Sequence, residues 1–310
     1  MWRYVYKRIL QLIPSFILVS FIVFWLMSVS GDPASVVGGL EATPEQLEAI
    51  RESMGLNRPL LIRYFEYMFN LLRGDFGVDI YGRDVWEQIS GRFPYTLALI
   101  VLSIFGATLV AVPSGIIAAL RKGSWGDTGL TVFCLFFNCM PVFWLGMMLQ
   151  SYFAVKLHWL PTSGIAKGVA ISLVLPTIAS VLTTMAGTCR QTRSSMLDNL
   201  NADYMRTALA KGVRYKKAVY KHALPNALIP IITAIGTIFA TSIGGSVALE
   251  TVFAWPGVGT LLIPAIRNFN YPLTCGCVIL MIVLIGVINL LVDLAYAFAD
   301  PRIKARYTGK

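Results

Sequence analysis

The sequence predicts an all-helical integral membrane protein with six transmembrane helices. Hydrophobic residues make up 56% of the 310 residues, whereas charged residues make up only 14%. The apolar residues gather in blocks, and a bilayer core of about 30 Å takes about 20 helical residues to cross. Lys and Arg gather in alternate connections between these blocks, which is the charge asymmetry typical of a multi-pass membrane protein.

Six apolar blocks predict the six spans. The first has a basic start like that of a secretory signal, but it is longer than the apolar part of such a signal and is predicted to remain as a helix. The fourth is diluted by Thr183, Thr184 and Thr188, and is kept because two basic chain ends require an even number of spans. In the third, Asn138 and Pro141 predict a kink. The predicted spans are residues 9–29, 95–120, 130–155, 171–188, 227–249 and 274–298.

The positive charge places both chain ends in the cytoplasm of a cell whose inner membrane holds the protein. The net charge of +10 is therefore interpreted as a topology signal, with membrane lipid rather than nucleic acid as the partner of the chain. The predicted parts are residues 1–30 (tail and first span), 31–94 (a small extracytoplasmic cap), 95–300 (a core of five spans with the loop 190–225) and 301–310 (a cytoplasmic tail).

Within the cap, two amphipathic helices are predicted. Thr43 can cap a first helix, Gln46 can complete its capping box, and Gly55 would end it. Pro59 can open a second helix, which Gly74 would end. These signals predict a small folded structure rather than a flexible linker.

The sequence contains no pattern for catalysis, nucleotide binding or metal binding. It lacks the phosphate-binding loop GxxxxGK[ST], the zinc-protease motif HExxH and the hydrolase motif GxSxG. The five cysteines form no CxxC pair, and the two histidines, His158 and His222, lie far apart in the sequence. The chain is therefore expected to be no enzyme, to bind no metal or cofactor itself, and to use ATP only through another chain.

The loop 190–225 carries the most informative pattern. Asn199 or Asn201 can cap a first short helix, Gly212 stands where a glycine commonly ends one, and a second helix follows up to Pro225. Two short helices across the membrane surface can be pushed by a partner and can transmit the push into spans four and five.

This loop resembles the coupling loop of ABC importer permeases, whose pattern is Glu-Ala-Ala, three residues, Gly, nine residues, Ile-x-Leu-Pro. Gly212 and the pair Leu224-Pro225 match that pattern in type and spacing, and Ala208 matches its second alanine. The positions that depart from it are Arg206, Thr207 and His222.

The departures fit one branch of that family. Residues 203–212 are similar to the version found in B-type permeases of dipeptide and oligopeptide importers, Asp-Tyr-x-Arg-Thr-Ala-x-Ala-Lys-Gly. Further segments that resemble this branch follow in its order along nearly the whole chain. They are Gly31-Asp32-Pro33, Gly55-Leu56-Asn57-Arg58-Pro59, Gly74-Asp75-Phe76-Gly77, Arg193-Ser194-Ser195-Met196-Leu197, Phe253-Ala254-Trp255-Pro256-Gly257-Val258-Gly259 and Asp300-Pro301-Arg302-Ile303.

The resemblance implies the type I ABC importer permease fold and a channel-forming subunit that brings di- or oligopeptides into the cell. The implied partners are a homologous second permease, two ATPase subunits that bind ATP and magnesium, and an extracytoplasmic substrate-binding protein. Nickel chelates, glutathione or another small solute stay open as substrates, because their importers share much of this pattern. A stand-alone secondary transporter is the alternative from another class, which would be expected to show intramembrane charges and inverted repeats.

The resemblance also implies that the loop docks on an ATPase, with Ala208 and Gly212 allowing close approach. An ordinary capped surface helix with basic residues is the simpler alternative. The candidate coupling residues are Asp203, Tyr204, Arg206, Thr207, Ala208, Lys211, Gly212, Arg214, His222, Leu224 and Pro225.

Span five has a small residue at every fourth position, at Gly236, Ala240, Gly244 and Ala248. Such a stripe predicts close helix packing, either within the subunit or along the channel and against a second permease. The family places span five near the translocation path. The candidate path residues are therefore Asn138, Thr237, Thr241, Ser242, Gly244 and Glu250.

Overall fold

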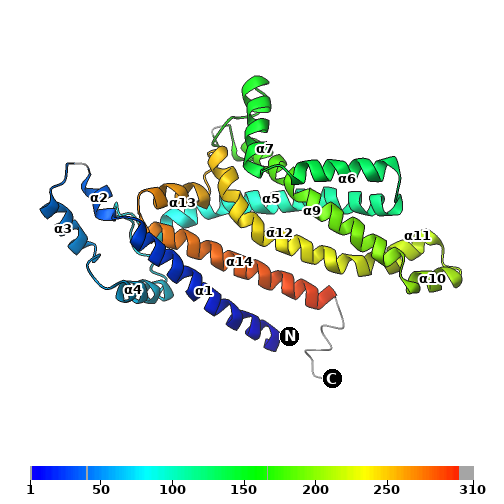
Figure 1. Ribbon diagram of the computed structural model, residues 1–310, viewed down its shortest axis with the longest axis horizontal. Helices are drawn as coiled ribbons and strands as arrows, with labels where there is room; N and C mark the ends of the chain where they lie inside the picture. Colours follow the sequence, from blue (N-terminus) through cyan, green and yellow to red (C-terminus); the bar gives the residue numbers. More distant parts are fainter. Residues whose placement is uncertain (1, 40, 166, 300–310) are drawn as a thin grey trace. The chain divides into compact units, whose positions relative to one another are not determined.

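The computed structural model describes residues 2–39, 41–165 and 167–299, and this part of the chain is helical almost throughout (Figure 1). The all-helical prediction is therefore confirmed for the described residues, in which no strand occurs. The predicted tail 301–310 lies outside them.

The chain divides into two compact units. The first comprises residues 98–255 together with the two chain ends, and the second comprises residues 6–97 and 256–286. The long helices α5 and α14 each contribute residues to both units. Each unit has its own buried apolar clusters.

Five helical stretches are long and apolar enough to cross a membrane, and a bent pair of helices provides a sixth crossing if both its arms form one span. The count of six, which takes the bent pair as one span, agrees with the six predicted blocks. The stretches are Leu10–Ser30 in α1 (Trp2–Ser30), α5 (Val85–Leu120), Val169–Leu200 in α8 (Val169–Ser172) and α9 (Val174–Leu200), Tyr215–Val252 in α11 (Tyr215–Ala218), η2 (Val219–Ala223) and α12 (Leu224–Val252), and Tyr271–Val292 in α14 (Tyr271–Ala299).

The bent pair replaces the predicted third span. α6 (Trp125–Asn138) meets α7 (Val142–Leu149) and its extension η1 (Gln150–Lys156) at 97°. Pro141 stands at the break, because its ring and missing N–H prevent it from continuing the preceding helix. The predicted kink is confirmed, and residues 130–155 form one broken span if both arms belong to the same crossing.

α9 continues to Leu200, so the connection that follows is shorter than the predicted loop 190–225. Hydropathy missed this extension because the added residues are polar. Their buried face includes Thr192 and Met196, and a Cβ at Gly115 of α5 would lie only 2.7 Å from the Thr192 Cβ. Close packing against α5 therefore sustains the helix beyond its apolar part.

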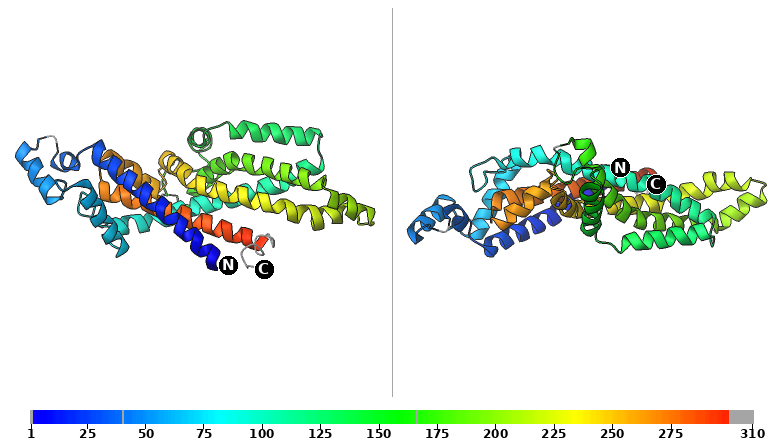
Figure 2. Two further views of the ribbon diagram at one scale, coloured as in Figure 1. Left: turned by 60° about the horizontal axis from the view of Figure 1, so that its bottom comes forward. Right: turned by 90° about the horizontal axis from the view of Figure 1, so that it is seen from above.

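In the first unit, α9 and α12 lie side by side in every view (Figures 1 and 2). Their contact is apolar, and it includes a residue near the end of α5. The buried members of this cluster are Ala119, Met196, Val219, Ala227 and Ile231.

The described part of the second unit contains four short helices that follow or precede its long helices in the sequence. α2 (Pro33–Gly38), α3 (Pro44–Ser53) and α4 (Leu60–Leu72) follow α1, and α13 (Val258–Arg267) precedes α14. Its main buried cluster lies between α5, α13 and α14. The members are Val85, Ile89, Val258, Leu262, Ala265, Leu273 and Cys277.

The predicted capping signals of the cap are confirmed. The Thr43 N–H donates to the Gln46 side-chain oxygen at 2.9 Å, and the Gln46 N–H donates to Thr43 Oγ1 at 3.3 Å. Gly55 and Gly74 have φ of +66° and +86°, the left-handed conformation in which glycine ends a helix at least cost.

The loop before α5 is held by a buried carboxylate. Asp79 accepts hydrogen bonds from the backbone N–H groups of Tyr81 and Arg83, both at 2.9 Å, and from the Arg83 guanidinium. Burial raises the pKa of Asp79, but these hydrogen bonds outweigh burial and hold the pKa below its ordinary value. Asp84 then accepts from the Glu87 N–H at 2.7 Å, so α5 begins well ahead of the predicted residue 95.

Candidate functional site

The connection between α9 and α12 folds as two short helices, as predicted. α10 (Asp203–Ala210) is followed by α11, and Met205 on the buried side of α10 is only 1% exposed. Met205 packs against Ala218 and Ala223, which precede α12. The connection is therefore a folded element fixed to the start of α12, which we call the coupling loop (residues 201–225).

The predicted cap of α10 is wrong. Its N-cap residue is Ala202, which makes no side-chain capping bond. Asn199 instead accepts a hydrogen bond from the Tyr204 hydroxyl at 2.6 Å, and the Asn201 amide donates to the Leu197 carbonyl at 2.9 Å. Asn201 therefore secures the end of α9, and Asn199 joins that end to Tyr204 of α10 without capping α10.

Gly212 ends the first helix, as predicted. Its N–H donates to the Leu209 carbonyl at 2.9 Å, and its φ is +79°. No heavy atom lies within 4 Å of the position that a Cβ would take. Glycine is therefore required by the backbone conformation rather than by packing inside the chain, and the space beside it is open to a partner.

Most of the predicted coupling residues are exposed, which a docking role requires. Ala208 is the exception: it is only 9% exposed, and its carbonyl accepts the Val213 N–H within the loop. The small size of Ala208 therefore serves packing within the loop, and its role in the approach of a partner stays a prediction. His222 and Leu224 are half-buried. The exposed members are Asp203, Tyr204, Arg206, Thr207, Lys211, Gly212, Arg214 and Pro225.

The second helix of the loop runs into α12 without a break. The turn η2 before Pro225 is a wide one, in which the Leu224 N–H donates to the Val219 carbonyl five residues back. A proline lacks an N–H and collides with the carbonyl four residues back in an ordinary helix, so the wide turn accommodates it. Tyr215–Val252 is one helical stretch, and a displacement of the loop reaches α12 without a flexible linker.

An ion pair that the sequence analysis missed ties α9 to α6. The Arg193 guanidinium holds both oxygens of Asp127, at 2.5 and 2.7 Å, and the Gly123 N–H donates to the same carboxylate at 3.0 Å. Asp127 is 3% exposed and the Arg193 side chain is 30% exposed. The available signal was that Asp127 is the one acidic residue in an apolar stretch next to a basic loop.

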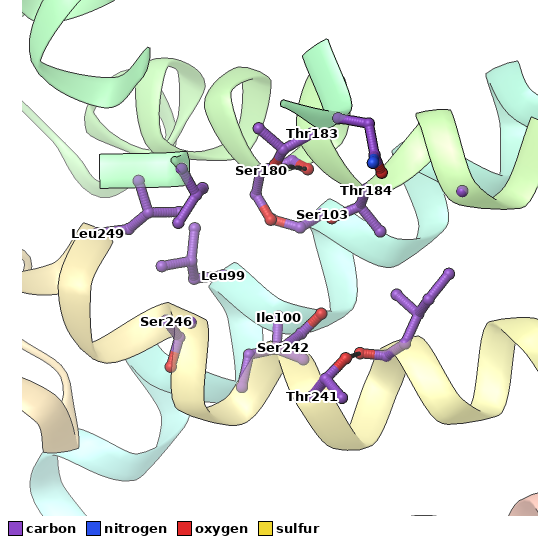
Figure 3. A pocket seen from close by; sticks show the side chains of 15 residues that line it. Leu99, Ile100, Ser103, Ser180, Thr183, Thr184, Thr241, Ser242, Ser246 and Leu249 are labelled. Atoms are coloured by element: carbon purple, nitrogen blue, oxygen red, sulfur yellow. Dashed lines mark hydrogen bonds between the residues drawn. The ribbon is translucent and has the colours of Figure 1, made fainter. Parts of the chain in front are cut away.

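A cavity of 280 Å³ lies between α5, α6, α7, α9 and α12 of the first unit. Figure 3 shows hydroxyl side chains of α9 facing those of α12 across it. Its lining holds eight uncharged polar side chains and no charged one. The polar members are Ser103, Asn138, Ser180, Thr183, Thr184, Thr241, Ser242 and Ser246.

Three hydroxyls of this cavity are placed to act as acceptors. Thr183, Thr241 and Ser246 each donate to carbonyls of their own helix, at 3.1, 3.0 and 2.8 Å. Their oxygen lone pairs then stay available to a solute. The Ser103 hydroxyl is 1% exposed and makes no hydrogen bond among the described residues, so it can donate to a solute.

The cavity brings together three of the six predicted path residues, Asn138, Thr241 and Ser242. Thr237 and Gly244 are exposed on α12 but do not line it, and Glu250 is fully buried outside it. The α5 and α9 contributions were missed, because serine and threonine within an apolar block give no periodic signal.

The small residues along α12 lie in two different environments. A Cβ at Gly236 would collide with Val292 of α14, whereas no heavy atom lies within 4 Å of the Cβ position at Gly244. The Gly236 end therefore packs within the chain, while Gly244 faces open space.

Among residues 2–39, 41–165 and 167–299, no group of three or more His, Cys, Asp or Glu side chains is placed to share a metal ion. Four cysteines are buried and Cys139 is exposed, and all five are free thiols. That the chain carries no cofactor of its own stays a prediction.

Two family models together match nearly the whole chain. The model described as binding-protein-dependent transport system inner membrane component matches residues 111–305. The model for the N-terminal part of such membrane components matches residues 1–100.

The chain is also similar to curated permeases over nearly its full length. It is 40% identical to a probable peptide ABC transporter permease of Sinorhizobium fredii, covering 97% of this chain and 99% of that one. It is 38% identical to a glutathione transport system permease of Escherichia coli, covering 98% and 99%. Among solved structures, it resembles an inward-facing form of the MetNI methionine ABC transporter, with a TM-score of 0.56, 19% identity, and coverage of 68% of this chain and 95% of that chain. This last likeness supports the type I importer permease fold.

Proposed function

Since the chain belongs to the family of binding-protein-dependent transport system inner membrane components, the permeases of ABC importers, we propose that it forms part of the path by which peptides cross the inner membrane. One observation carries the proposal: α9 and α12, whose side chains face each other across the cavity, are joined at their other ends by the coupling loop (Figure 3). A force on the loop therefore acts on two walls of the cavity.

The coupling loop is the proposed docking site for an ATPase subunit. Its six basic residues outnumber its one acidic residue, Asp203, so it is complementary to an acidic surface. ATP and magnesium would be bound by two such ATPases, and each would move one coupling loop when ATP closes them together. The basic residues are Arg206, Lys211, Arg214, Lys216, Lys217 and Lys221.

The remaining partners follow from the same assignment. A homologous second permease would complete the central path, and a substrate-binding protein would deliver the solute from outside. The coupling loop and both chain ends would then lie in the cytoplasm, in line with the positive-inside distribution of Lys and Arg. The permease itself performs no covalent chemistry.

The cavity offers hydrogen-bonding groups that suit a peptide backbone. Peptides offer N–H donors along their backbone, and the hydroxyl oxygens of α9 and α12 are acceptors without fixed charge. A lining without charge also tolerates varied side chains. The relatives named for peptide and glutathione transport point to the same class, because glutathione is itself a tripeptide.

The test is uptake by proteoliposomes that hold both permeases and both ATPases, supplied with the binding protein. We expect ATP-dependent uptake of labelled di- or oligopeptide, with little uptake of a nickel chelate. Uptake by the permeases alone would identify a secondary transporter and overturn the proposal. Coupled uptake of nickel chelates without peptides would overturn the substrate alone.

Paired threonine variants connect the uptake to the cavity. Thr183→Val and Thr241→Val remove acceptors at nearly constant volume, and losing about 1 kcal/mol of hydrogen bonding should raise KM for the peptide about fivefold. Thr251→Val, on the exposed surface of α12 outside the cavity, is the matched control and should leave KM unchanged. Equal KM in all three variants would show that the cavity does not hold the solute.

A further inference from the structure

Helix α4 of the second unit carries two apolar arcs and one polar arc. At 100° per residue, the first apolar arc contains Tyr64, Tyr67 and Met68, which pack against α1. The second apolar arc adjoins it and is largely exposed, although the Arg73 guanidinium lies 4.1 Å from the centre of the Phe69 ring at its end. Its members are Leu61, Ile62, Phe65, Phe69 and Leu72.

The first arc fixes the depth of α4 along the first span. The Tyr64 hydroxyl bonds to the Ile17 carbonyl at 3.1 Å and to Ser20 Oγ at 2.8 Å, and the Tyr64 ring meets the Phe24 ring edge-on with centroids 5.6 Å apart. All three partners lie within the membrane-crossing stretch Leu10–Ser30. Ser20 precedes Ser30 by ten residues, which at 1.5 Å each is about 15 Å inside the end of the span.

The polar arc of α4 lines an open cavity, and its members Glu66 and Asn70 stay exposed. Arg63, Glu66 and Asn70 line a 390 Å³ cavity together with residues of α1, α14 and the turn before α4. Glu66 also pairs with Arg58 at 3.0 Å, and the Arg63 guanidinium lies 5.7 Å from the centre of the Phe24 ring. The charged groups of α4 therefore lie off the second apolar arc, and Glu66 is paired although its side chain is 52% exposed.

The second apolar arc continues a similar surface of α1. Phe65 is 66% exposed and Leu72 is 83% exposed. On α1, Leu18 and Trp25 are exposed at the same level as the contacts of Tyr64. Isolated apolar residues on a surface are ordinary, but a contiguous apolar arc beside a membrane span matches the hydrocarbon of a bilayer.

We propose that α4 lies within the bilayer beside α1 and that its second apolar arc contacts lipid acyl chains. Within the predicted extracytoplasmic cap 31–94, α4 would then be the part that contacts lipid. A water-soluble binding protein is disfavoured as the occupant, because the Tyr64 hydrogen bonds place the arc at the depth of the span. α3, which has no buried residue and is mostly exposed, stays in water.

Spin-label accessibility tests this placement in the full complex in liposomes. Labels are attached to Phe65→Cys and Phe69→Cys, with Asn70→Cys on the polar arc as the matched control one residue away. The exposed Cys139 is first replaced by alanine, since the other cysteines are buried. We expect frequent collisions of the first two labels with oxygen, which concentrates in hydrocarbon, and few with a water-soluble nickel chelate. At Asn70→Cys we expect the nickel chelate to be the better quencher.

Two results would overturn the proposal. Ready access of the nickel chelate to residues 65 and 69 would place the arc in water. Protection from both oxygen and the chelate would show that a protein covers it, either the second permease or the binding protein, and repeating the measurement without the binding protein separates these two. Each labelled complex is also assayed for ATP-dependent uptake. Uptake equal to that of the unlabelled complex shows that the labelled complex is folded.

Discussion

The two ends of the α9–α12 pair differ in chemistry although the same helices build both. The cavity end presents neutral hydroxyls and a carboxamide without any charged side chain. The coupling loop presents six basic residues and one acidic residue on an exposed surface. Fixed charge in a low-dielectric path would hold an oppositely charged solute too tightly for release. Exposed charge, by contrast, steers a partner and is screened by salt.

The largest expected effect on ATP-dependent uptake comes from filling the cavity end of the α9–α12 pair. Gly245 lines the cavity, and no heavy atom lies within 4 Å of its Cβ position. Gly245→Leu should therefore place its side chain in the cavity and reduce ATP-dependent uptake at least roughly tenfold, a barrier of about 1.4 kcal/mol. ATPase docking on the loop should stay unchanged.

Gly244→Leu is the matched control for that variant, because Gly244 has equal room but does not line the cavity. Comparable uptake by Gly244→Leu and the unmodified chain is expected. If both variants lose uptake equally, the loss does not come from filling the cavity, and the role assigned to the cavity end is contradicted.

The second effect concerns the ion pair between the two ends. Arg193→Ala leaves Asp127 as an unpaired carboxylate that is 3% exposed, which should cost about 3–5 kcal/mol of stability. Asp127→Asn leaves Arg193 uncompensated, but that side chain is 30% exposed and can be hydrated, so the cost should be smaller. Thermal unfolding in lipid nanodiscs measures both.

The double variant decides whether the pair acts as a unit. Arg193→Ala with Asp127→Asn should be more stable than Arg193→Ala alone, since no buried charge is left unpaired. Strictly additive losses would contradict the role assigned to this pair in fixing α9 to α6.

Much of this architecture could be predicted from local sequence signals. Apolar block lengths gave the spans, Thr43 and Gln46 gave a capping box, and Gly212 gave a helix end. Each of these depends on residues close together in the chain. The residue pattern of the coupling loop also indicated the family that the family models then matched.

The features that could not be predicted depend on contacts distant in sequence. The extension of α9 rests on its packing against Gly115, and the burial of Met205 on α10 rests on its packing against Ala218 and Ala223. The cavity draws hydroxyls from helices far apart in the chain, and Ser103 gives no local sign of lining the same cavity as Thr241. Pro141 indicated a break, but its 97° angle depends on the packing of α7.

A third, moderate effect is expected at the loop end. Gly212→Ala forces a side chain into a φ of +79°, which should cost about 1–2 kcal/mol and distort the turn after α10. We expect the ratio of solute imported to ATP hydrolysed to fall. Gly129→Ala, on α6 with open space and an ordinary helical backbone, should leave that ratio unchanged. An unchanged ratio in Gly212→Ala would show that coupling does not depend on the conformation of the loop at residue 212.

The smallest effect tests the hydrogen bond that joins α10 to the end of α9. Tyr204→Phe removes the donor to Asn199 at an exposed position, where water replaces it, so the cost should be only about 0.5 kcal/mol. Tyr220→Phe is the control at a more exposed tyrosine of the same loop. Because Tyr204 joins the loop to one cavity wall without adding charge, its loss should lower the transport-to-ATPase ratio slightly without changing how ATPase binding depends on salt. A changed salt dependence would place Tyr204 in the docking surface instead.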